Sequence, residues 1–339
     1  MKKRSSKRKK RSSAPVKRAA RKIKHQPWGF KDFLSMKEVQ GADLDVLFKL
    51  TDKMKKHPEQ FQSKLKGRSL AMLFQKPSMR TRVSFEVGMQ ELGGVAVYMP
   101  PQEHPLGERE SIKDIARVLS RYCDAAVIRT YAHEDIEEFA RHTSMPVING
   151  LSDTYHPCQT LADLYTIREK FKGLAKMNIA YIGDGNNVLS SLLYGAARVG
   201  ANLAIALPRG YEPNEEILKD IKLISKDSGS KITLSNNPFT AIKNAHAIYT
   251  DVWVSMGQEK QREQRLRDFQ PFQLNAAIIG KAPKDSVIMH CLPAHRGEEI
   301  TDEVIEHPRS VIFDQAENRL HTQKALLYLM LTTKRKKQS

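Results

Sequence analysis

Short apolar runs alternate with helical patterns along most of this chain. The expected strands are SLAMLF (69–74), VAVYM (95–99), AAVIRT (125–130), PVING (146–150), NIAYIG (178–183), NLAIAL (202–207), KITLS (231–235), AIYTDVW (247–253), SVIMHCL (286–292) and SVIFDQ (310–315). The expected helices include VSFEVGMQELGG (83–94), SIKDIARVLSRY (111–122), DIEEFARHT (135–143), QTLADLYTIREKF (159–171), NEEILKDIKLISKD (214–227) and NRLHTQKALLYLMLTT (318–333). This alternation is typical of mainly parallel sheets with crossover helices on their faces, so we predict an α/β fold.

The length of 339 residues exceeds the usual size of a single hydrophobic core, so two domains are expected. A long helix ends near residue 170 and a new strand follows, which places a boundary there. We predict domains of similar size at 28–170 and 171–317, with a cleft between them. A C-terminal helix at 318–334 is expected to pack back on the first domain, and 1–27 is a separate tail.

Composition excludes several classes of protein. Hydrophobic residues make up 40% of the chain and charged residues 28%, as in ordinary globular proteins. No apolar run reaches the ~18 residues of a membrane span. The cysteines Cys123, Cys158 and Cys291 form no CxxC pair, which argues against a disulfide framework and fits a reducing compartment. With no secretory signal visible, we expect a cytoplasmic location.

The net charge of +18 is concentrated at the N-terminus. Residues 1–25 hold thirteen Lys or Arg and no acid, which leaves the rest of the chain at about +5. We expect the tail to be disordered and to act as a solvated arm with weak, non-specific contact to polyanions. Specific nucleic-acid binding and organelle targeting are the alternatives, and the tail offers no aromatic residue to stack on bases.

Polar clusters follow several of the expected strands, where ligands bind in α/β sheets. In KPSMRTR (76–82), Ser78 is placed to cap a helix that begins near Met79, so free N–H groups, hydroxyls and Arg80 would converge as a phosphate site. Arg129 ends a buried strand and needs an anionic or carbonyl partner. His156 and Gln159, in HPCQ (156–159), could donate hydrogen bonds to an oxygen that becomes negative in a transition state. Each cluster also has a purely structural interpretation. KPSMRTR could be a solvated turn, Arg129 could form a salt bridge, and His156 could cap a helix.

Three further clusters lie in the second half. GDGNN (183–187) lacks the third glycine of a dinucleotide-binding turn, because Val188 follows Asn187, and we therefore exclude nicotinamide binding. DVWVSMG (251–257) and HCLPAHRG (290–297) close the set. Adjacent strand residues face opposite sides, so His290 and Cys291 are not expected to form a nucleophile pair. Nor does their spacing favour a metal site.

Taken in order, KPSMRTR, the Arg129 strand, HPCQ, GDGNN, DVWVSMG and HCLP resemble the carbamoyltransferase family over residues 30 to 334. Among its members, DxWxSMG and HCLP are similar to the ornithine branch. The resemblance implies two domains with the active site between them, a homotrimer or a multiple of trimers, and no cofactor or metal. The implied substrates are carbamoyl phosphate and L-ornithine, with no membrane partner. A carbamoyltransferase for putrescine or acylated ornithine is the alternative, and a polyanion-binding protein is a more distant one.

The resemblance also implies roles for individual residues. Carbamoyl phosphate would be held by Ser78, Met79, Arg80, Thr81, Arg82, Arg129, His156, Gln159, Cys291, Leu292 and Arg319. Ornithine would be bound by Asn187, Asp251, Ser255, Met256, Cys291 and Leu292. The residues implied in catalysis are Arg129, His156, Gln159, Asp251 and Cys291. We expect Asp251 and Cys291 to orient the ornithine amine and to help remove its proton.

Two positions depart from the family pattern. Met79 stands where many members have Thr, which matters little if the backbone N–H binds the phosphate. Pro105 stands where many bacterial members have a glutamine that reaches the carbamoyl phosphate of a neighbouring subunit. Proline has no side chain that can donate, and we do not assign that role to His104.

Overall fold

The structure is a computed structural model that describes residues 28–333. The expectations for the basic tail at 1–27, and for residue 334 at the end of the C-terminal helix, lie outside these residues.

A four-stranded parallel sheet forms the centre of the first half, in the order β2-β1-β3-β4. Its strands are β1 (Ser69–Phe74), β2 (Val95–Met99), β3 (Ala125–Arg129) and β4 (Val147–Leu151). The helices of this half are α1 (Gly41–Lys56), α2 (Met79–Glu91), α3 (Ile112–Tyr122), α4 (His133–Arg141) and α5 (Pro157–Phe171), with a 3-10 turn at Pro58–Gln60. Every residue of β3 is buried, as expected of a central parallel strand covered on both faces.

A five-stranded parallel sheet forms the second half, in the order β7-β6-β5-β8-β9. Its strands are β5 (Asn178–Ile182), β6 (Asn202–Ala206), β7 (Ile232–Ser235), β8 (Ala247–Thr250) and β9 (Val287–His290). Its helices are α6 (Asn187–Arg198), α7 (Glu215–Ser228), α8 (Pro238–Ile242), α9 (Arg262–Phe269), α10 (Ala276–Ile279) and α11 (Asp302–Ile305), with 3-10 turns at Glu259–Gln261 and Gln270–Phe272.

The last helix, α12 (Ile312–Thr332), corrects one prediction. The segment 310–315 was expected to be a strand, and the C-terminal helix was expected to start at 318. In the structure Ser310 makes a single bridge with Ile288 of β9, and the chain then turns directly into the helix. The buried residues follow helical spacing, because Ile312, Gln315 and Arg319 lie three and four residues apart on one face of α12.

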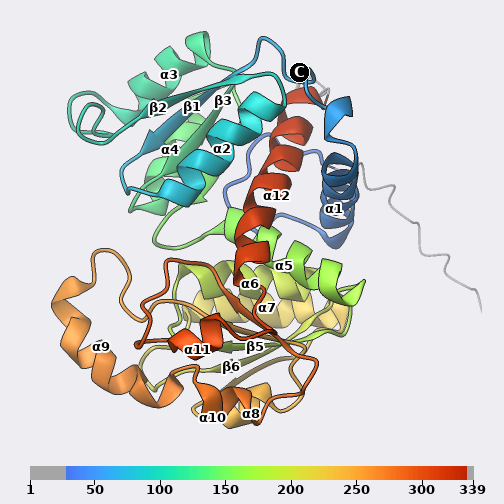
Figure 1. The fold of residues 1–339 in the computed structure, drawn as a ribbon. Helices are drawn as coiled ribbons and strands as arrows, with labels where there is room; N and C mark the ends of the chain where they lie inside the picture. The colour runs from blue at the N-terminus through green and yellow to red at the C-terminus, as the bar shows by residue number, and fades with distance from the viewer. Residues whose placement is uncertain (1–27, 334–339) are drawn as a thin grey trace, which may run out of the picture.

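A layer of helices joins the two sheets. In Figure 1, α12 (red) runs from the lower half into the upper half beside α5 and α1. Buried side chains of α1, α5, α6 and α12 form one continuous hydrophobic core with residues of both sheets. This shared layer holds the carboxyl ends of the two sets of strands in a fixed relation.

The predicted α/β class is confirmed, and nine of the ten expected strands correspond to β1 through β9. The three cysteines are free. Among the helices within residues 28–333, none has both the length and the apolar character needed to span a bilayer.

Candidate active site

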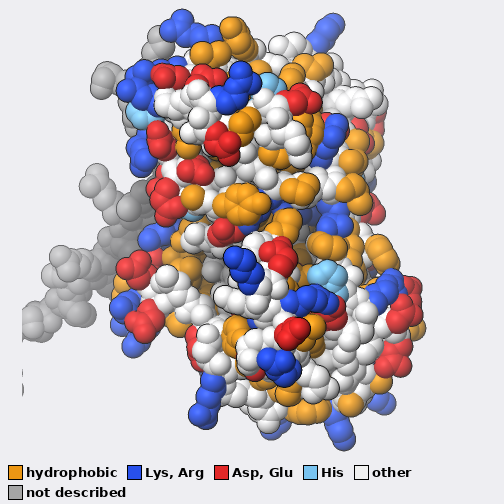
Figure 2. Space-filling view, turned by 90° about the vertical axis from the view of Figure 1, so that its left-hand side faces the viewer, with side chains coloured by type: hydrophobic (Ala, Val, Ile, Leu, Met, Phe, Trp, Pro, Cys, Tyr) orange, Lys and Arg blue, Asp and Glu red, His pale blue; other side chains and the backbone are white. Residues whose placement is uncertain are grey.

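A cavity of about 1000 Å³ lies between the two halves, at the carboxyl ends of strands from both sheets. The surface is hollowed between the upper and lower parts of the molecule in Figure 2. Of the predicted site residues, those that line the cavity are Ser78, Met79, Arg80, Thr81, Arg129, His156, Asn187, Asp251, Ser255, Met256, Cys291, Leu292 and Arg319. Residues far apart in sequence therefore share one space.

The start of α2 forms one wall. As predicted, Ser78 caps the helix: its Oγ accepts a hydrogen bond from the Thr81 N–H at 3.2 Å and lies 3.1 Å from Thr81 Oγ1. The N–H groups of Met79 and Arg80, the first two residues of the helix, have no carbonyl partner within it. These donors and the positive end of the helix dipole favour an anion at this point.

Three arginines add positive charge to the same wall. Arg129 donates through Nε to the Lys76 carbonyl oxygen at 3.1 Å, and Arg319 donates through Nη2 to Thr81 Oγ1 at 3.2 Å. Arg80 has neither a hydrogen bond nor an ion pair to any of the described residues. Burial and the charges of Arg319 and Arg80 lower the pKa of Arg129 to about 9. Cations that repel one another and form no ion pair with an acid favour the binding of an anion.

His156 lies among these arginines as a neutral ring. Burial lowers its pKa well below the usual value, and the positive charges of Arg319, Arg129 and Arg80 lower it further. Its Nδ1 is buried without a hydrogen-bond partner in the described part of the chain. A neutral imidazole can donate one hydrogen bond to a substrate oxygen without adding charge.

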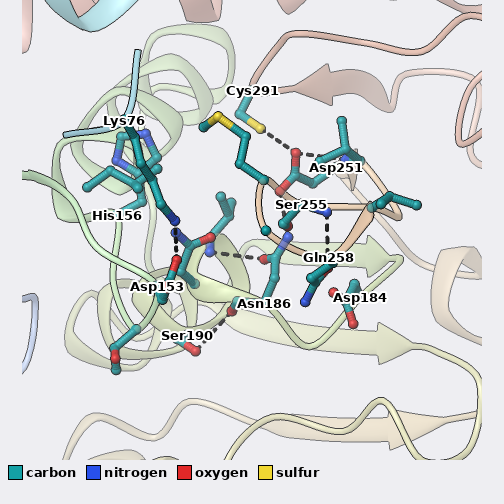
Figure 3. Close-up of a pocket in the computed structure, with 18 of the residues that line it drawn as sticks. Lys76, Asp153, His156, Asp184, Asn186, Ser190, Asp251, Ser255, Gln258 and Cys291 are labelled. Atoms are coloured by element: carbon teal, nitrogen blue, oxygen red, sulfur yellow. Dashed lines mark hydrogen bonds and ion pairs between the residues drawn. The ribbon is translucent and has the colours of Figure 1, made fainter. Parts of the chain in front are cut away.

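Asp251 and Cys291 form the opposite wall (Figure 3). The Cys291 thiol donates to Asp251 Oδ1 at 2.8 Å, Asn186 Nδ2 donates to Oδ2 at 2.6 Å, and the Val252 N–H donates to Oδ1 at 2.8 Å. Burial, followed by the neighbouring Asp251 carboxylate, raises the pKa of Cys291 well above its usual value. Cys291 is therefore a protonated thiol near neutral pH, and the Asp251 carboxyl lines the cavity beside it.

The loop after Asp251 carries Ser255 and Met256. The Ser255 N–H donates to Gln258 Oε1 at 3.0 Å. The start of the loop is anchored by Arg265, which donates through Nη1 to the Trp253 carbonyl oxygen at 2.8 Å and to Asp184 Oδ2 at 2.9 Å. The buried Arg265–Asp184 pair thus fixes this loop to the turn after β5.

Two predicted residues are not brought to the cavity wall. Arg82 points away: its Nε donates to Glu86 Oε1 at 3.0 Å, and its guanidinium stacks 3.9 Å from the centre of the Tyr98 ring. Gln159 lies behind the wall, where its Oε1 accepts from Arg319 Nη1 at 2.7 Å. Gln159 therefore supports a cavity residue in this structure.

Sequence reasoning missed Asn186, Lys76 and Asp153, which also line the cavity. Asn186 caps α6 through Oδ1 and reaches Asp251 through Nδ2, a dual role that an asparagine directly before a helix could have suggested. Lys76 is buried and forms an ion pair with Asp153, and its ammonium lies 4.3 Å from the centre of the Tyr131 ring. The lysine was visible in KPSMRTR, but its acidic partner follows a different strand.

The glycine pattern in GDGNN has a structural cause. A Cβ on Gly185 would lie 2.4 Å from the Tyr211 carbonyl oxygen, so only glycine fits where these two backbones meet. The second glycine is thus explained by close packing of the turn.

Two groups of side chains within residues 28–333 have the ligand types of a metal site. In the first, Asp251 and Cys291 bond to each other, while His290 Nε2 lies 3.0 Å from Glu299 Oε1 and its Nδ1 accepts from the Leu292 N–H at 2.8 Å. In the second, His295 Nδ1 lies 3.8 Å from Glu298 and 3.9 Å from Glu299, as an ion pair would place it. Hydrogen bonds account for the first group, whereas His295 Nδ1, Glu298 Oε2 and Glu299 Oε2 of the second group have no hydrogen-bond partner among the described residues.

Comparison with known proteins identifies the family. A model of the carbamoyl-P binding domain of aspartate/ornithine carbamoyltransferases matches residues 31–169, and a model of their Asp/Orn binding domain matches residues 175–330. This chain belongs to the aspartate/ornithine carbamoyltransferase family.

Relatives within this carbamoyltransferase family align along nearly their whole length. An ornithine carbamoyltransferase of Anoxybacillus flavithermus is 49% identical over 303 residues, which cover 89% of this chain and 96% of the relative. One from Pyrococcus horikoshii is 53% identical over 267 residues, covering 79% and 84%. The solved structure of ornithine carbamoyltransferase from Pyrococcus furiosus has a TM-score of 0.86 at 47% identity and covers 90% of this chain and 98% of that one.

Proposed function

We propose that this chain transfers the carbamoyl group of carbamoyl phosphate to the δ-amine of L-ornithine, giving L-citrulline and phosphate. One observation carries the proposal: a wall of arginines that form no ion pair with an acid in the described part of the chain faces a buried Asp251–Cys291 pair across a single cavity. The first wall suits a dianionic phosphate, and the second suits an amine. The names of the family models and of the relatives agree with these two substrates.

On the phosphate side, Arg80 and the N–H groups at the start of α2 would hold the phosphate group. Arg129 and neutral His156 would donate hydrogen bonds to the carbonyl oxygen. This oxygen becomes negative when the amine attacks the carbonyl carbon, so donors fixed in place stabilise the transition state more than the substrate. The assignment of carbamoyl phosphate to residues 28–170 and of ornithine to 171–317 forms part of the proposal.

On the amine side, ornithine arrives as an ammonium ion. An alkylamine has a pKa near ~10.4, so freeing its lone pair at pH 7 costs about 4–5 kcal/mol. Asp251 would hold the amine, and the Cys291 thiol would release its hydrogen bond to Asp251 as the amine takes that place. The ammonium first releases one proton to solvent with the help of Asp251, which frees the lone pair. The neutral nitrogen then bonds to the carbonyl carbon, the bond from that carbon to the phosphate oxygen breaks, and the leaving phosphate takes a second proton from the nitrogen.

The resemblance also implies a homotrimer, which we include in the proposal. Val95 and Val97 of β2, at the edge of the first sheet, are 61% and 46% exposed, and exposed Val83 lies on the adjacent helix α2. Such an apolar edge favours contact with another chain. Light scattering coupled to size exclusion would test it, and a monomeric mass would refute this part. A cytoplasmic location stays a prediction from the cysteine content.

The direct test is an assay of the purified protein with carbamoyl phosphate and a panel of amines. We expect citrulline from ornithine, and much slower reaction with putrescine and acylated ornithine. Reaction with putrescine and not with ornithine would overturn the choice of substrate. Absence of carbamoyl transfer to every amine, with tight nucleic-acid binding by a chain lacking residues 1–27, would favour the polyanion-binding alternative.

A further inference from the structure

Asp163 is a buried carboxyl that lies behind the cavity instead of on its wall. It belongs to α5 and is 0% exposed. Burial raises its pKa to about 7, while hydrogen bonds from neighbouring side chains act in the opposite direction. A carboxyl buried at this cost requires an explanation.

One oxygen of Asp163 accepts hydrogen bonds from two side-chain amides. Oδ1 accepts from Gln159 Nε2 at 2.8 Å and from Gln315 Nε2, on α12, at 2.7 Å. Because both amide nitrogens point at the carboxyl, both amide oxygens must point away from it. Asp163 thus sets the orientation of two side chains on different helices.

The oxygen of Gln159 leads to the phosphate wall. It accepts from Arg319 Nη1 at 2.7 Å, and Arg319 Nη2 donates to Thr81 Oγ1 at 3.2 Å. If the amide turned over, its NH₂ group would face a guanidinium, which cannot accept a hydrogen bond. Asp163 therefore helps to set the direction of Arg319, together with Gln323, whose Oε1 accepts from Arg319 Nε at 2.8 Å.

The oxygen of Gln315 leads to the amine wall. It accepts at 3.0 Å from the N–H of His290, the residue before Cys291. Asp163 is therefore connected to both walls of the cavity.

We propose that Asp163 is a positioning residue for carbamoyl transfer, which orients Gln159 and Gln315 and thereby aligns Arg319 with Cys291 across the cavity. This inference rests on the proposed function. It assigns a task to a carboxyl that touches neither substrate, and it explains why a polar network spans the core between the two halves.

The first test removes the acceptor. Asp163→Leu is expected to lower kcat by about 10²-fold and to raise the KM for carbamoyl phosphate several-fold, while the KM for ornithine changes by less than about threefold, since misplaced groups slow the reaction more than they weaken binding. Thr166→Val is the matched control. Thr166 lies one turn further along α5, where its hydroxyl accepts from Asn318 of α12 at 2.9 Å, away from the cavity. The control is expected to lose stability and keep kcat within about twofold.

The second test reverses the direction of the hydrogen bond between Gln315 and Asp163. It remains informative even if the Asp163→Leu variant does not fold. Gln315→Glu places a second carboxyl against Asp163 and is expected to lower kcat. Adding Asp163→Asn restores a donor and an acceptor: the new amide accepts from Gln159 and donates to the new carboxylate. We expect the double variant to recover at least about tenfold in kcat over Gln315→Glu alone.

Two results would overturn the inference: a folded Asp163→Leu protein with the kcat of the parent, or a Gln315→Glu loss that Asp163→Asn does not relieve. Failure of the proposed function looks different, because the parent chain itself would then form no citrulline. Calorimetry with inorganic phosphate as the probe would still decide in that case. Asp163→Leu should weaken phosphate binding if Arg319 is misaligned, and unchanged binding would refute the positioning role.

Discussion

At the scale of single residues, burial and mutual charge set the protonation states in the cavity. His156 is neutral because it is buried and lies near three arginines, and Cys291 stays a thiol because it is buried against Asp251. The same groups exposed to water would titrate near their ordinary values. Each residue's chemistry thus depends on neighbours that come from distant parts of the chain.

Removal of Arg80 tests the anion wall. Arg80→Gln is expected to lower kcat/KM for carbamoyl phosphate by about 10²–10³-fold, as for the loss of a group that stabilises developing charge. Arg82→Gln is the control, because Arg82 points to Glu86 and Tyr98, and its activity should stay within about threefold. Equal losses in steady-state assays of the two variants would contradict the placement of Arg80.

Removal of the Cys291 thiol tests the amine wall. Cys291→Ala should lower kcat by about 10- to 100-fold, as expected when a hydrogen bond to a charged group is lost. In the parent protein, the raised pKa leaves little thiolate at pH 8, so Cys291 should react with iodoacetamide much more slowly than a free thiol. Peptide mapping measures this reaction. Rapid alkylation, or a variant with unchanged turnover and pH profile, would remove Cys291 from the proposed role.

At the scale of elements, the start of α2 links stability to function. Ser78→Ala removes the helix cap and should cost about 1 kcal/mol of unfolding free energy. It should also weaken phosphate binding, since the cap arranges the donors of the wall. Ser111 caps α3 in the same way and lies away from the cavity, so Ser111→Ala should show the stability loss alone. Urea unfolding and phosphate calorimetry on both variants separate the two effects.

The sequence predicted these elements unevenly. Strand positions and the start of α2 at Met79 were predictable, because apolar runs and a capping serine are local signals. The strand expected at 310–315 was wrong, since an apolar run of that length fits a strand or a buried helix equally well. Which of two nearby side chains faces the cavity was not predictable: Arg80 lines it and Arg82 does not.

Contacts between elements were beyond the reach of sequence reasoning. Asp163, Gln159 and Gln315 meet only because α5 and α12 cross. Their separation along the chain gives no signal in a single sequence. The same holds for the pairing of Lys76 with Asp153.

At the scale of the whole molecule, buried carboxyls make stability depend on pH. The pKa of Asp163 is raised from 3.8 to about 7 in the folded protein, so the folded state holds this proton more tightly than the unfolded state. Its contribution is therefore present below pH ~4 and is lost as the pH rises through ~7, by on the order of 4 kcal/mol at most. Asp184, with its pKa raised to about 6, acts in the same direction.

The Asp163→Asn variant tests this dependence. An amide cannot ionise, so the free energy of unfolding of the variant, relative to the parent, should increase between pH 4 and pH 7. Urea unfolding at several pH values gives this difference. A constant or decreasing difference would show that the carboxyl is not buried in the unligated protein.

The wall of unneutralised arginines also has a consequence for the idle enzyme. Repulsion among Arg80, Arg129 and Arg319 is relieved when an anion occupies the wall, so the empty protein is the least stable form. Inorganic phosphate, the product of the reaction, would raise the melting temperature, and at a hundred times its dissociation constant it would add about 2.7 kcal/mol. Scanning calorimetry in phosphate against an uncharged buffer of equal ionic strength would reveal it. Phosphate left from earlier turnover would then stabilise the resting enzyme, and preparations from which this ion has been removed would lose activity first.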